Sequence, residues 1–321
     1  MKKWLSLVIS LFFLFMLALK LKQVGYEEMK QALSSVNPSY FISAVLLMVV
    51  SALLQAVRWQ IILKPIGNFF LMAIFPSVAI GHWFNLILPA RLGELARPFH
   101  FAKKHSLPYG TIIATTLLER VADALAILLL IFTAAIILKG NINAKTAMLL
   151  LFLASVTMLM TLAMIKYRYK ILNLLTLRFG ENSFKKHIGD FIIGINLVRG
   201  PKQISGIAVS TLFIWLANIC AYGLLLWGCN LPSALTTAEA AVLVTLASAV
   251  AHAIPSSASG LGVFNYSVVV ALEAYSSTIP QNHSDSSASI AIFSLIVYLA
   301  AITPDIFIGG YYYWRGRFLL G

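Results

Sequence analysis

Residues 81–97 combine apolar sequence with ionisable side chains in a way that suits the binding of an anion. An apolar run is followed at once by a proline and by charged or small residues: Pro89, Arg91, Gly93, Glu94 and Arg97. Ionisable groups in such a setting are usually kept where they pair or line a wet cavity. Because arginine is always charged and grips phosphate with a planar fork, Arg91 and Arg97 are our phosphate-binding candidates. Glu94, three residues from each, could pair with either and hold it in place.

A second stretch, residues 252–265, repeats this pattern of an apolar run, a proline, small residues and a further apolar run. Its candidate binding positions are Pro255, Ser257, Gly260 and Gly262. Proline and glycine predict a broken helix whose exposed backbone amides could hold a phosphate, as helix N-termini do. The serines do not form a nucleophile elbow, since no base and acid partner follow in a recognisable arrangement. Two broken helices in one chain favour a binding site.

A third group of charges interrupts the long apolar segment from Leu107 to Leu138. Glu119 and Asp123 are four residues apart and share one helix face, and Arg120 lies about 100° round from Glu119. These three side chains would complete a cavity wall, and carboxylates at depth could also carry a proton or bind a coupling cation. Two structural alternatives stay open. The group could be an ion-pair set that locks two helices, and Arg91 and Arg97 could merely anchor a cytoplasmic loop.

The remaining reactive side chains indicate neither a metal site nor a cofactor. His82 and His252 each lie near a broken tip without another ligand at metal-binding spacing, so we interpret them as interfacial or hydrogen-bonded residues. Asp305 follows a proline in the last apolar span and is either functional or the partner of a kink. Cys220 and Cys229 are interpreted as packing residues. No Walker A motif occurs, so we expect no ATP hydrolysis by the chain itself. We assign no catalytic residue and expect no cofactor.

The composition predicts an all-α polytopic membrane protein. The chain has 321 residues, of which 60% are hydrophobic and 11% charged, and its mean hydropathy is +0.87. Soluble domains carry roughly 25% charged residues. The net charge of +13 comes from residues that sit between apolar runs. It therefore indicates membrane topology and attraction to anionic headgroups rather than binding of nucleic acid.

The positive-inside bias organises these apolar runs into about six full transmembrane helices and two re-entrant helical hairpins. The apolar run from Trp4 to Leu19 is expected to be a retained first span, and the second span ends at Arg58-Trp59, a pair suited to the inner interface. Residues 91–105 are basic, so residues 69–105 are predicted to dip in and return rather than cross. Residues 238–275 are predicted to do the same from the outside. Both termini are then expected to lie in the cytoplasm, and the protein is expected to lie in the cell membrane.

These elements form an inverted repeat within a single membrane domain, residues 1–321. The first half, 1–165, holds the hairpin 69–105, and the second half, 205–321, holds the hairpin 238–275. A basic cytoplasmic connection with amphipathic helices, 166–204, joins them. Inverted repeats with discontinuous helices at the midplane are a recurrent transporter design. The pattern therefore favours a transporter.

Three motifs in order resemble the lysylphosphatidylglycerol synthetase transmembrane-region family, over nearly the whole chain. They are LPARLGELAR (88–97), TTLLERVAD (115–123) and IPSSASGLGVF (254–264). The family is flippase-like. In its best-known member, the multiple peptide resistance factor, a membrane domain translocates aminoacylated phospholipid and a separate soluble domain makes that lipid. This chain stops at Gly321 without that domain, so the resemblance implies lipid handling rather than synthesis. Asn265 departs from the acidic residue expected after the second tip.

We therefore predict a lipid translocase that moves an anionic phospholipid or polyprenyl phosphate through a polar cavity in the membrane. Carrying a bare headgroup charge across roughly 30 Å of hydrocarbon has a large desolvation cost, which a cationic cavity lowers. The alternatives are a membrane-embedded enzyme with Glu94, Glu119 or Asp123 as general base, and an accessory scaffold acting on lipid-linked phosphate or sugar. The expected partners are membrane lipids. A homo-oligomer and a separate lipid-modifying enzyme stay open.

Overall fold

The fold is known from a computed structural model that describes residues 11–19, 30, 34, 36–88, 91–137, 189–191, 193–198, 200–229, 231–254, 260–277 and 286–316. Apart from residues 11–19, which are also helical, the main helices are α3 (Pro38–Leu63), α4 (Leu71–Ile87), α5 (Gly93–His105), α6 (Tyr109–Ile137), α10 (Pro201–Gly228), α11 (Ala238–Ala253), α12 (Val263–Ser276), α13 (Ser286–Pro304) and α14 (Gly310–Gly316). A π-helical turn, Asp305–Gly309, makes α13 and α14 continuous. The predicted helical fold is confirmed, since the described residues contain no strand.

Three helices in the described part of the chain are long and apolar enough to cross a membrane. They span Pro38–Leu63, Pro201–Gly228 and Ser289–Gly316. The outer face of α3 carries an exposed apolar stripe of Ile42, Leu46 and Val50, spaced four residues apart on one side of the helix. A face of this kind suits lipid tails rather than water. The chain is therefore a membrane protein, and the count of six full spans stays a prediction.

Several predicted segments lie outside the described residues. These are most of the first span, residues 138–188 with the predicted span 146–165, and most of the basic connection 166–204. One boundary prediction was wrong. Helix α3 continues to Leu63, and Arg58 and Trp59 lie inside it with 1% and 0% of their surface exposed. They are core residues and not an interfacial pair, because a neighbouring helix supplies the buried arginine with carboxylates.

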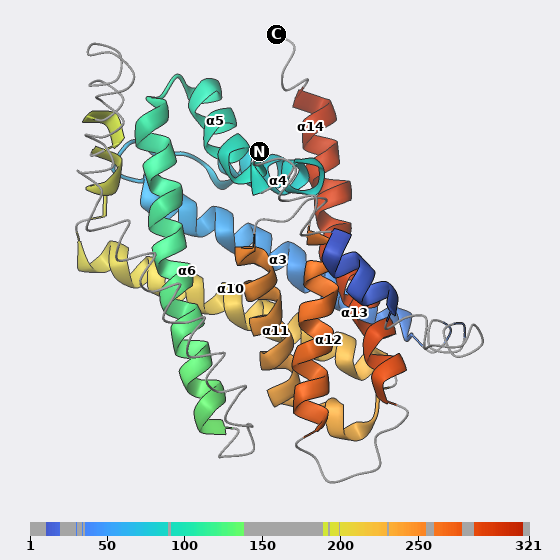
Figure 1. The fold of residues 1–321 in the computed structure, drawn as a ribbon. Helices are drawn as coiled ribbons and strands as arrows, with labels where there is room; N and C mark the ends of the chain where they lie inside the picture. The colour runs from blue at the N-terminus through green and yellow to red at the C-terminus, as the bar shows by residue number, and fades with distance from the viewer. Residues whose placement is uncertain are drawn as a thin grey trace.

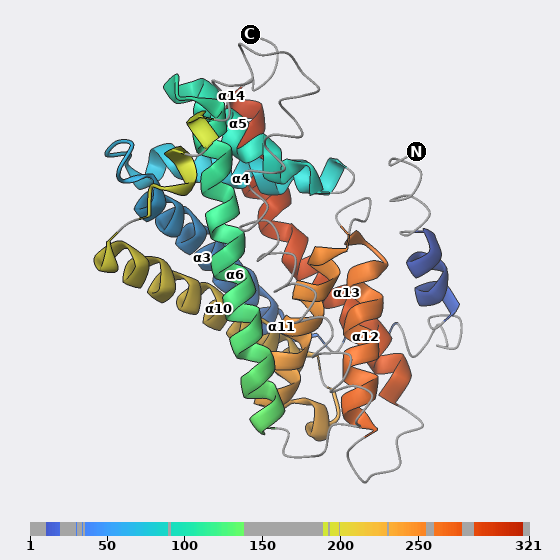
Figure 2. The same cartoon turned by 60° about the vertical axis from the view of Figure 1, so that its left-hand side comes forward.

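Two helical hairpins occupy opposite halves of the bundle. Helices α4 and α5 pack together in the upper half of Figures 1 and 2, and α11 and α12 pack together in the lower half. Their bounds match the predicted segments 69–105 and 238–275 closely. The long helices α3 and α10 pack against each other alongside both hairpins. The placement of these hairpins as re-entrant segments in a membrane stays a prediction.

The helix breaks in the two hairpins have the same local cause. The residue before a proline is pushed out of the helical region. Leu88, before Pro89, is extended with ψ 138°, and Ile254, before Pro255, is extended with ψ 125°. The chain then re-enters a helix through positive φ values, 56° at Arg91 in the first hairpin and 82° and 87° at Gly260 and Gly262 in the second. Proline ends each first helix, and a left-handed turn lies before each second helix.

Glycine lets the first hairpin close tightly. A Cβ atom on Gly93 would lie 2.2 Å from the carbonyl oxygen of Gly81 and 2.4 Å from the amide nitrogen of Asn85. A Cβ atom on Gly81 would likewise lie 2.8 Å from the Cβ of Arg97. Only glycine permits this approach of backbones. The seam between α4 and α5 thus places Arg97 and its neighbours against the centre of the bundle.

Candidate functional site

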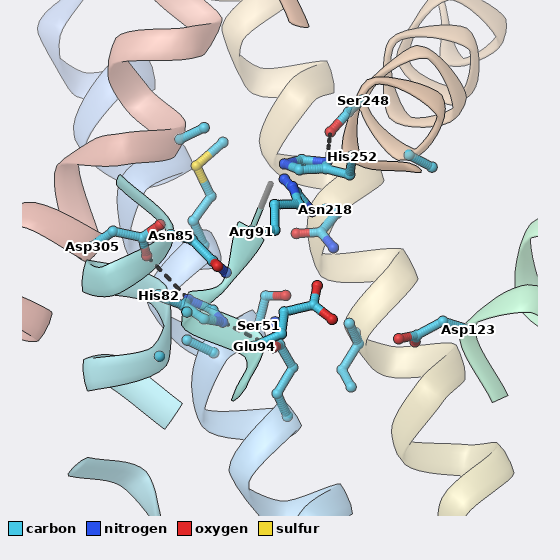
Figure 3. Close-up of a pocket in the computed structure, with 18 of the residues that line it drawn as sticks. Ser51, His82, Asn85, Arg91, Glu94, Asp123, Asn218, Ser248, His252 and Asp305 are labelled. Atoms are coloured by element: carbon cyan, nitrogen blue, oxygen red, sulfur yellow. Dashed lines mark hydrogen bonds and ion pairs between the residues drawn. The ribbon is translucent and has the colours of Figure 1, made fainter. Parts of the chain in front are cut away.

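A cavity of about 620 Å³ lies among the helices, and residues from α3, α4, α5, α6, α10, α11, α12 and α13 line it. Figure 3 shows polar side chains from several of these helices facing its interior. The volume falls within the roughly 300–1,000 Å³ of small-molecule sites. Polar side chains in a membrane bundle usually face the bundle interior or a water-filled cavity, where they mark substrate pathways. The cavity is therefore the candidate binding site.

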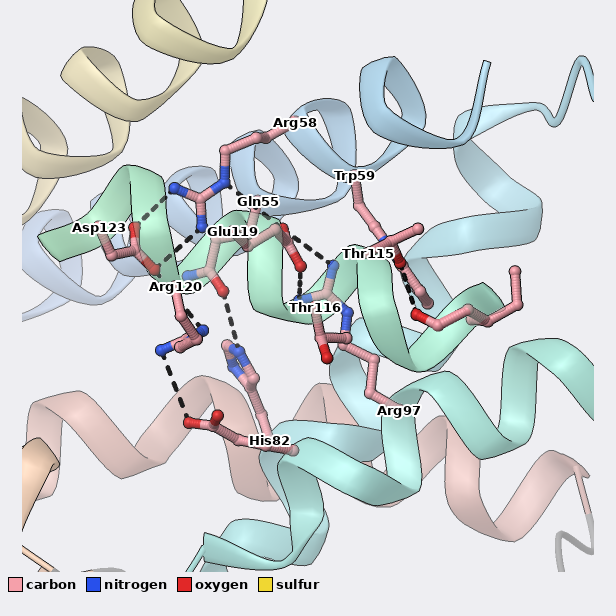
Figure 4. A network of polar contacts seen from close by, with 12 residues as sticks. Gln55, Arg58, Trp59, His82, Arg97, Thr115, Thr116, Glu119, Arg120 and Asp123 are labelled. Atoms are coloured by element: carbon pink, nitrogen blue, oxygen red, sulfur yellow. Dashed lines mark hydrogen bonds and ion pairs between the residues drawn. The ribbon is translucent and has the colours of Figure 1, made fainter. Parts of the chain in front are cut away.

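One wall of the cavity rests on a buried ion pair between α3 and α6. The Arg58 guanidinium donates from Nη1 to Asp123 Oδ1 at 2.6 Å and from Nη2 to Asp123 Oδ2 at 3.2 Å. Its Nε lies 3.4 Å from Glu119 Oε1, and Nη1 also donates to Thr211 Oγ1 of α10 at 3.1 Å. Figure 4 shows this network. A two-pronged arginine–carboxylate pair fixes geometry as well as charge, so Arg58 holds three helices together.

Arg97 joins the same network from the first hairpin. Its Nη1 lies 3.1 Å from Glu119 Oε2 and its Nη2 donates to Glu119 Oε1 at 3.3 Å. The guanidinium carbon stacks 4.0 Å from the centre of the Trp59 ring, whose indole nitrogen donates to Thr115. Glu119, 1% exposed, thus lies between two buried arginines. Because a carboxylate and an aromatic ring already contact the Arg97 guanidinium, this side chain suits a role in positioning the first hairpin.

Arg120 differs from these two arginines because it opens into the cavity. Its side chain is 48% exposed, and its nearest carboxylates, Glu94 and Asp123, are both 3.6 Å away. These separations are longer than a hydrogen bond. The two carboxylates balance the charge of Arg120 but leave its N–H donors available for hydrogen bonds. Arg120 can therefore form hydrogen bonds with a further acceptor in the cavity.

Arg91 is the second arginine whose side chain opens into the cavity. It occupies the first hairpin tip at φ 56°, a left-handed conformation that is uncommon for a residue with a side chain. Among the residues that the structure describes, none accepts a hydrogen bond from its guanidinium. Glu94, Asp305 and Tyr222 lie within electrostatic reach of it. Figure 3 shows Arg91 reaching into the cavity toward Asn218 and His252. Backbone strain of this kind persists where the surrounding structure holds the residue in place, often at ligand sites.

A further polar link joins the first hairpin to the last helix. His82 Nδ1 lies 3.1 Å from Asp305 Oδ1, and its Nε2 lies 3.2 Å from the side-chain amide of Gln55 on α3. Both His82 and Asp305 are 26% exposed toward the cavity. Asp305 begins the π-helical turn after Pro304, a feature that often marks functional positions. The interpretation of His82 as a hydrogen-bonded residue agrees with this geometry.

The opposite wall carries neutral groups from α10 and α11. The Tyr222 hydroxyl and Ser248 Oγ are 3.0 Å apart, and Ser248 Oγ lies 3.3 Å from His252 Nδ1. Trp215, Asn218 and Thr245 complete the polar part of this wall. The lining from α10 and α11 therefore contains no side chain with a permanent charge, in contrast to that from α3, α5 and α6.

The structure brings most of the predicted site residues to this one cavity. Its lining includes those predicted from the first hairpin and from α6, namely Arg91, Gly93, Glu94, Arg97, Glu119, Arg120 and Asp123. Gly260 and Gly262 form the second tip but are not part of the lining. Pro255 and Ser257 lie outside the described residues. Their role in binding stays a prediction.

Sequence reasoning missed the neutral wall and the central role of Arg58. Arg58 is a charge within a long apolar helix, which could have marked it, but its position near a predicted span end favoured an interface. On α10, Trp215, Asn218 and Tyr222 recur at helical spacing, a pattern that could have been found in the sequence.

Asn265 now has a structural explanation. Its Oδ1 accepts from the Gly262 amide at 3.3 Å, and its Nδ2 donates to the Ser294 carbonyl at 2.9 Å. A carboxylate could accept the first bond but could not donate the second. The side chain is fully buried and ties the second hairpin tip to α13. Asn265 therefore fastens the second hairpin to α13.

Comparison with known proteins gives a family and three relatives. A family model described as the lysylphosphatidylglycerol synthase TM region matches residues 3–304. A UPF0104 membrane protein of Methanocaldococcus jannaschii is 33% identical over 127 residues, covering 38% of this chain and 36% of the relative. A UPF0104 membrane protein of Pyrococcus horikoshii is 27% identical over 186 residues, covering 55% and 54%. The glycosyltransferase AglD of Haloferax volcanii is 31% identical over 116 residues, covering 35% and 18%. The chain thus spans between about a fifth and about half of these relatives' lengths.

Proposed function

The chain belongs to the lysylphosphatidylglycerol synthase TM-region family, and from that premise we propose that it moves an anionic lipid headgroup across the cytoplasmic membrane through the cavity. The observation that carries the proposal is the pair of cations at Arg91 and Arg120, which face a cavity of about 620 Å³ inside an apolar helical bundle. Two guanidiniums in one cavity suit a phosphate, which each can grip with a planar fork.

The binding step follows from the loose pairing of Arg120. Glu94 and Asp123 balance its charge at 3.6 Å. A phosphate that enters between Arg91 and Arg120 makes shorter charge-assisted hydrogen bonds, and Glu94 turns toward water in the cavity while Asp123 stays paired with Arg58. The headgroup then exchanges its hydration for fixed cations, which lowers the desolvation cost of crossing the hydrocarbon.

The buried arginines supply the frame for this step. Arg58 and Arg97 share Glu119, and all three side chains are at most 7% exposed. Their charges are compensated by the protein itself, so they hold α3, α5 and α6 in register. In this proposal the phosphate role passes to Arg91 and Arg120, and Arg97 positions the hairpin that carries Arg91. The lipid tails stay outside, against apolar faces such as that of α3.

A second candidate function draws on the partial similarity to a glycosyltransferase. That relative is matched over 18% of its length, so the shared part is compatible with a membrane segment that accompanies an enzyme. In this alternative the chain acts on lipid-linked phosphate or sugar, as an enzyme or as a scaffold, and Glu94 lies at the cavity surface as the available base. A chemical change in the lipid, without a change of leaflet, would favour it.

The experiment is a leaflet assay with the purified full chain in liposomes that contain a fluorescent anionic phospholipid. Arg91→Ala should lower the rate of lipid movement about 10- to 100-fold, the equivalent of one lost hydrogen bond to a charged group. Arg120→Ala should act in the same direction. Arg315→Ala is the matched control, because Arg315 is exposed at the end of α14 and pairs with Tyr311 away from the cavity. Wild-type rates in both cavity variants would overturn the proposal.

A further inference from the structure

Two stripes of polar side chains without a permanent charge line the cavity on α10 and α11. Helix α10 contributes Trp215, Asn218 and Tyr222, and helix α11 contributes Thr245, Ser248 and His252. Each set follows the spacing i, i+3, i+7, so its members share one face of their helix. The two helices pack against each other. The stripes therefore form one continuous polar surface, which we call the neutral wall.

The neutral wall has unused hydrogen-bonding capacity. Thr245 donates to the carbonyl of Ala241 in its own helix, and Tyr222, Ser248 and His252 form a chain. By contrast, the Trp215 indole nitrogen is buried without a partner among the described residues. The Asn218 carboxamide, which points into the cavity, likewise has no partner in that part of the chain. A buried donor left unpaired destabilises the fold, so such groups are retained where a ligand or water completes them.

The chemistry of this wall selects the kind of group that it can bind. The side chains of Asn218, Ser248 and Tyr222 each carry both a donor and an acceptor. A hydroxyl group also offers both, whereas an ammonium group offers donors alone and a carboxylate acceptors alone. Asn218, Ser248 and His252 lie on the side of the cavity toward which Arg91 reaches (Figure 3). A phosphate held by the arginines would thus present its substituent to a surface that matches hydroxyl groups.

We propose that the headgroup has two parts, a phosphate bound at Arg91 and Arg120 and an uncharged polyhydroxy group, a sugar or polyol, bound by the neutral wall. This inference rests on the proposed function and adds the class of headgroup to it. A site built to hydrogen-bond hydroxyl groups discriminates strongly against an analogue that lacks them, because its own polar groups are then left unpaired. The neutral wall is accordingly the specificity-determining part of the cavity.

The test compares two lipids with the same acyl chains and the same phosphodiester charge. Phosphatidylinositol carries a ring of hydroxyl groups, and phosphatidylethanol carries an ethyl group. Calorimetry on the full chain in nanodiscs should show tighter binding of phosphatidylinositol. Asn218→Leu and Ser248→Ala should each weaken phosphatidylinositol binding roughly three- to tenfold, the equivalent of one neutral hydrogen bond, and so reduce the preference for phosphatidylinositol over phosphatidylethanol. Ser210→Ala is the control, since Ser210 lies on α10 outside the cavity and bonds to its own helix.

The outcomes separate this inference from the proposed function. If the wild-type chain binds both lipids equally and Arg91→Ala weakens both, the neutral wall does not select hydroxyl groups and the inference fails alone. If neither lipid binds, the proposed function fails and the inference falls with it. If soluble inositol phosphate binds as tightly as phosphatidylinositol, the hydroxyl preference stands, and the assignment of a lipid substrate is overturned.

Discussion

The two hairpins share a backbone design and differ in what they bring to the cavity. In both, a residue before proline ends the first helix and a left-handed turn precedes the second. The first hairpin carries Arg91, Glu94 and Arg97 into the bundle, and Arg97 is fastened by a buried carboxylate. The second hairpin is fastened by the amide of Asn265 and by an extensive apolar core. Topology therefore repeats while chemistry does not.

Under the proposed function, this difference separates two tasks within one fold. Charged groups recognise phosphate but need counterions when buried, so the first hairpin must be supported by Arg58 and Glu119. Neutral groups need only hydrogen-bond partners, so the second half of the chain can expose amides and hydroxyl groups to the cavity at lower cost. If this account is right, substitutions that break buried charge pairs should be more damaging than those that disturb neutral fastenings.

The largest effect is expected from Arg58→Ala. The change leaves Glu119 and Asp123 buried beside α3 without their shared cation and removes the link to Thr211. Losing one partner of a buried ion pair costs about 3–5 kcal/mol of folding free energy. Thermal unfolding of the purified protein in detergent measures the loss, with Arg315→Ala as the matched control. If Arg58→Ala unfolded at the wild-type temperature, the packing of α3, α6 and α10 would not depend on this network.

Gly93→Ala tests the close packing of the first hairpin. The added methyl group would lie 2.2 Å from the Gly81 carbonyl oxygen, a backbone atom that cannot rotate away. Overpacking typically costs about 1–3 kcal/mol, and contact with backbone places this variant near the upper end. Gly223→Ala on α10 is the control, because its methyl group would meet Ala241 at an ordinary 3.6 Å. Equal unfolding temperatures for the two variants would contradict the tight seam.

Asn265→Asp tests the neutral fastening of the second hairpin, with the smallest expected effect. The carboxylate would lose the hydrogen bond donated to Ser294 and place an acceptor against that carbonyl. We expect a loss of about 1–2 kcal/mol in unfolding free energy, the cost of one unsatisfied buried group. Asn37→Asp is a matched control, since Asn37 caps α3 by accepting from the Ser39 amide, which a carboxylate can also do. An unchanged unfolding temperature for Asn265→Asp would show that the fold does not require an amide at this position.

Much of the site was predictable because its signals are local. The breaks at residues 88–92 and 254–262 follow from proline and glycine, whose effects act on adjacent residues. Ionisable side chains in apolar sequence marked Arg91, Glu94, Glu119, Arg120 and Asp123, and all of them line one cavity. Three motifs predicted the family, which the match over residues 3–304 confirms.

The sequence did not predict which arginines face the cavity and which are buried in ion pairs, because this depends on partners that are distant in the sequence. Arg58 lies 61 residues from Glu119, and His82 lies 223 residues from Asp305. Arg91 and Arg97 look equivalent in the sequence, yet one opens into the cavity and the other is enclosed by Glu119 and Trp59. Local sequence determined where the helices break and where charge enters the bundle. Only tertiary packing decided which charges are neutralised, because a buried charge takes its counterion from whichever helix lies beside it.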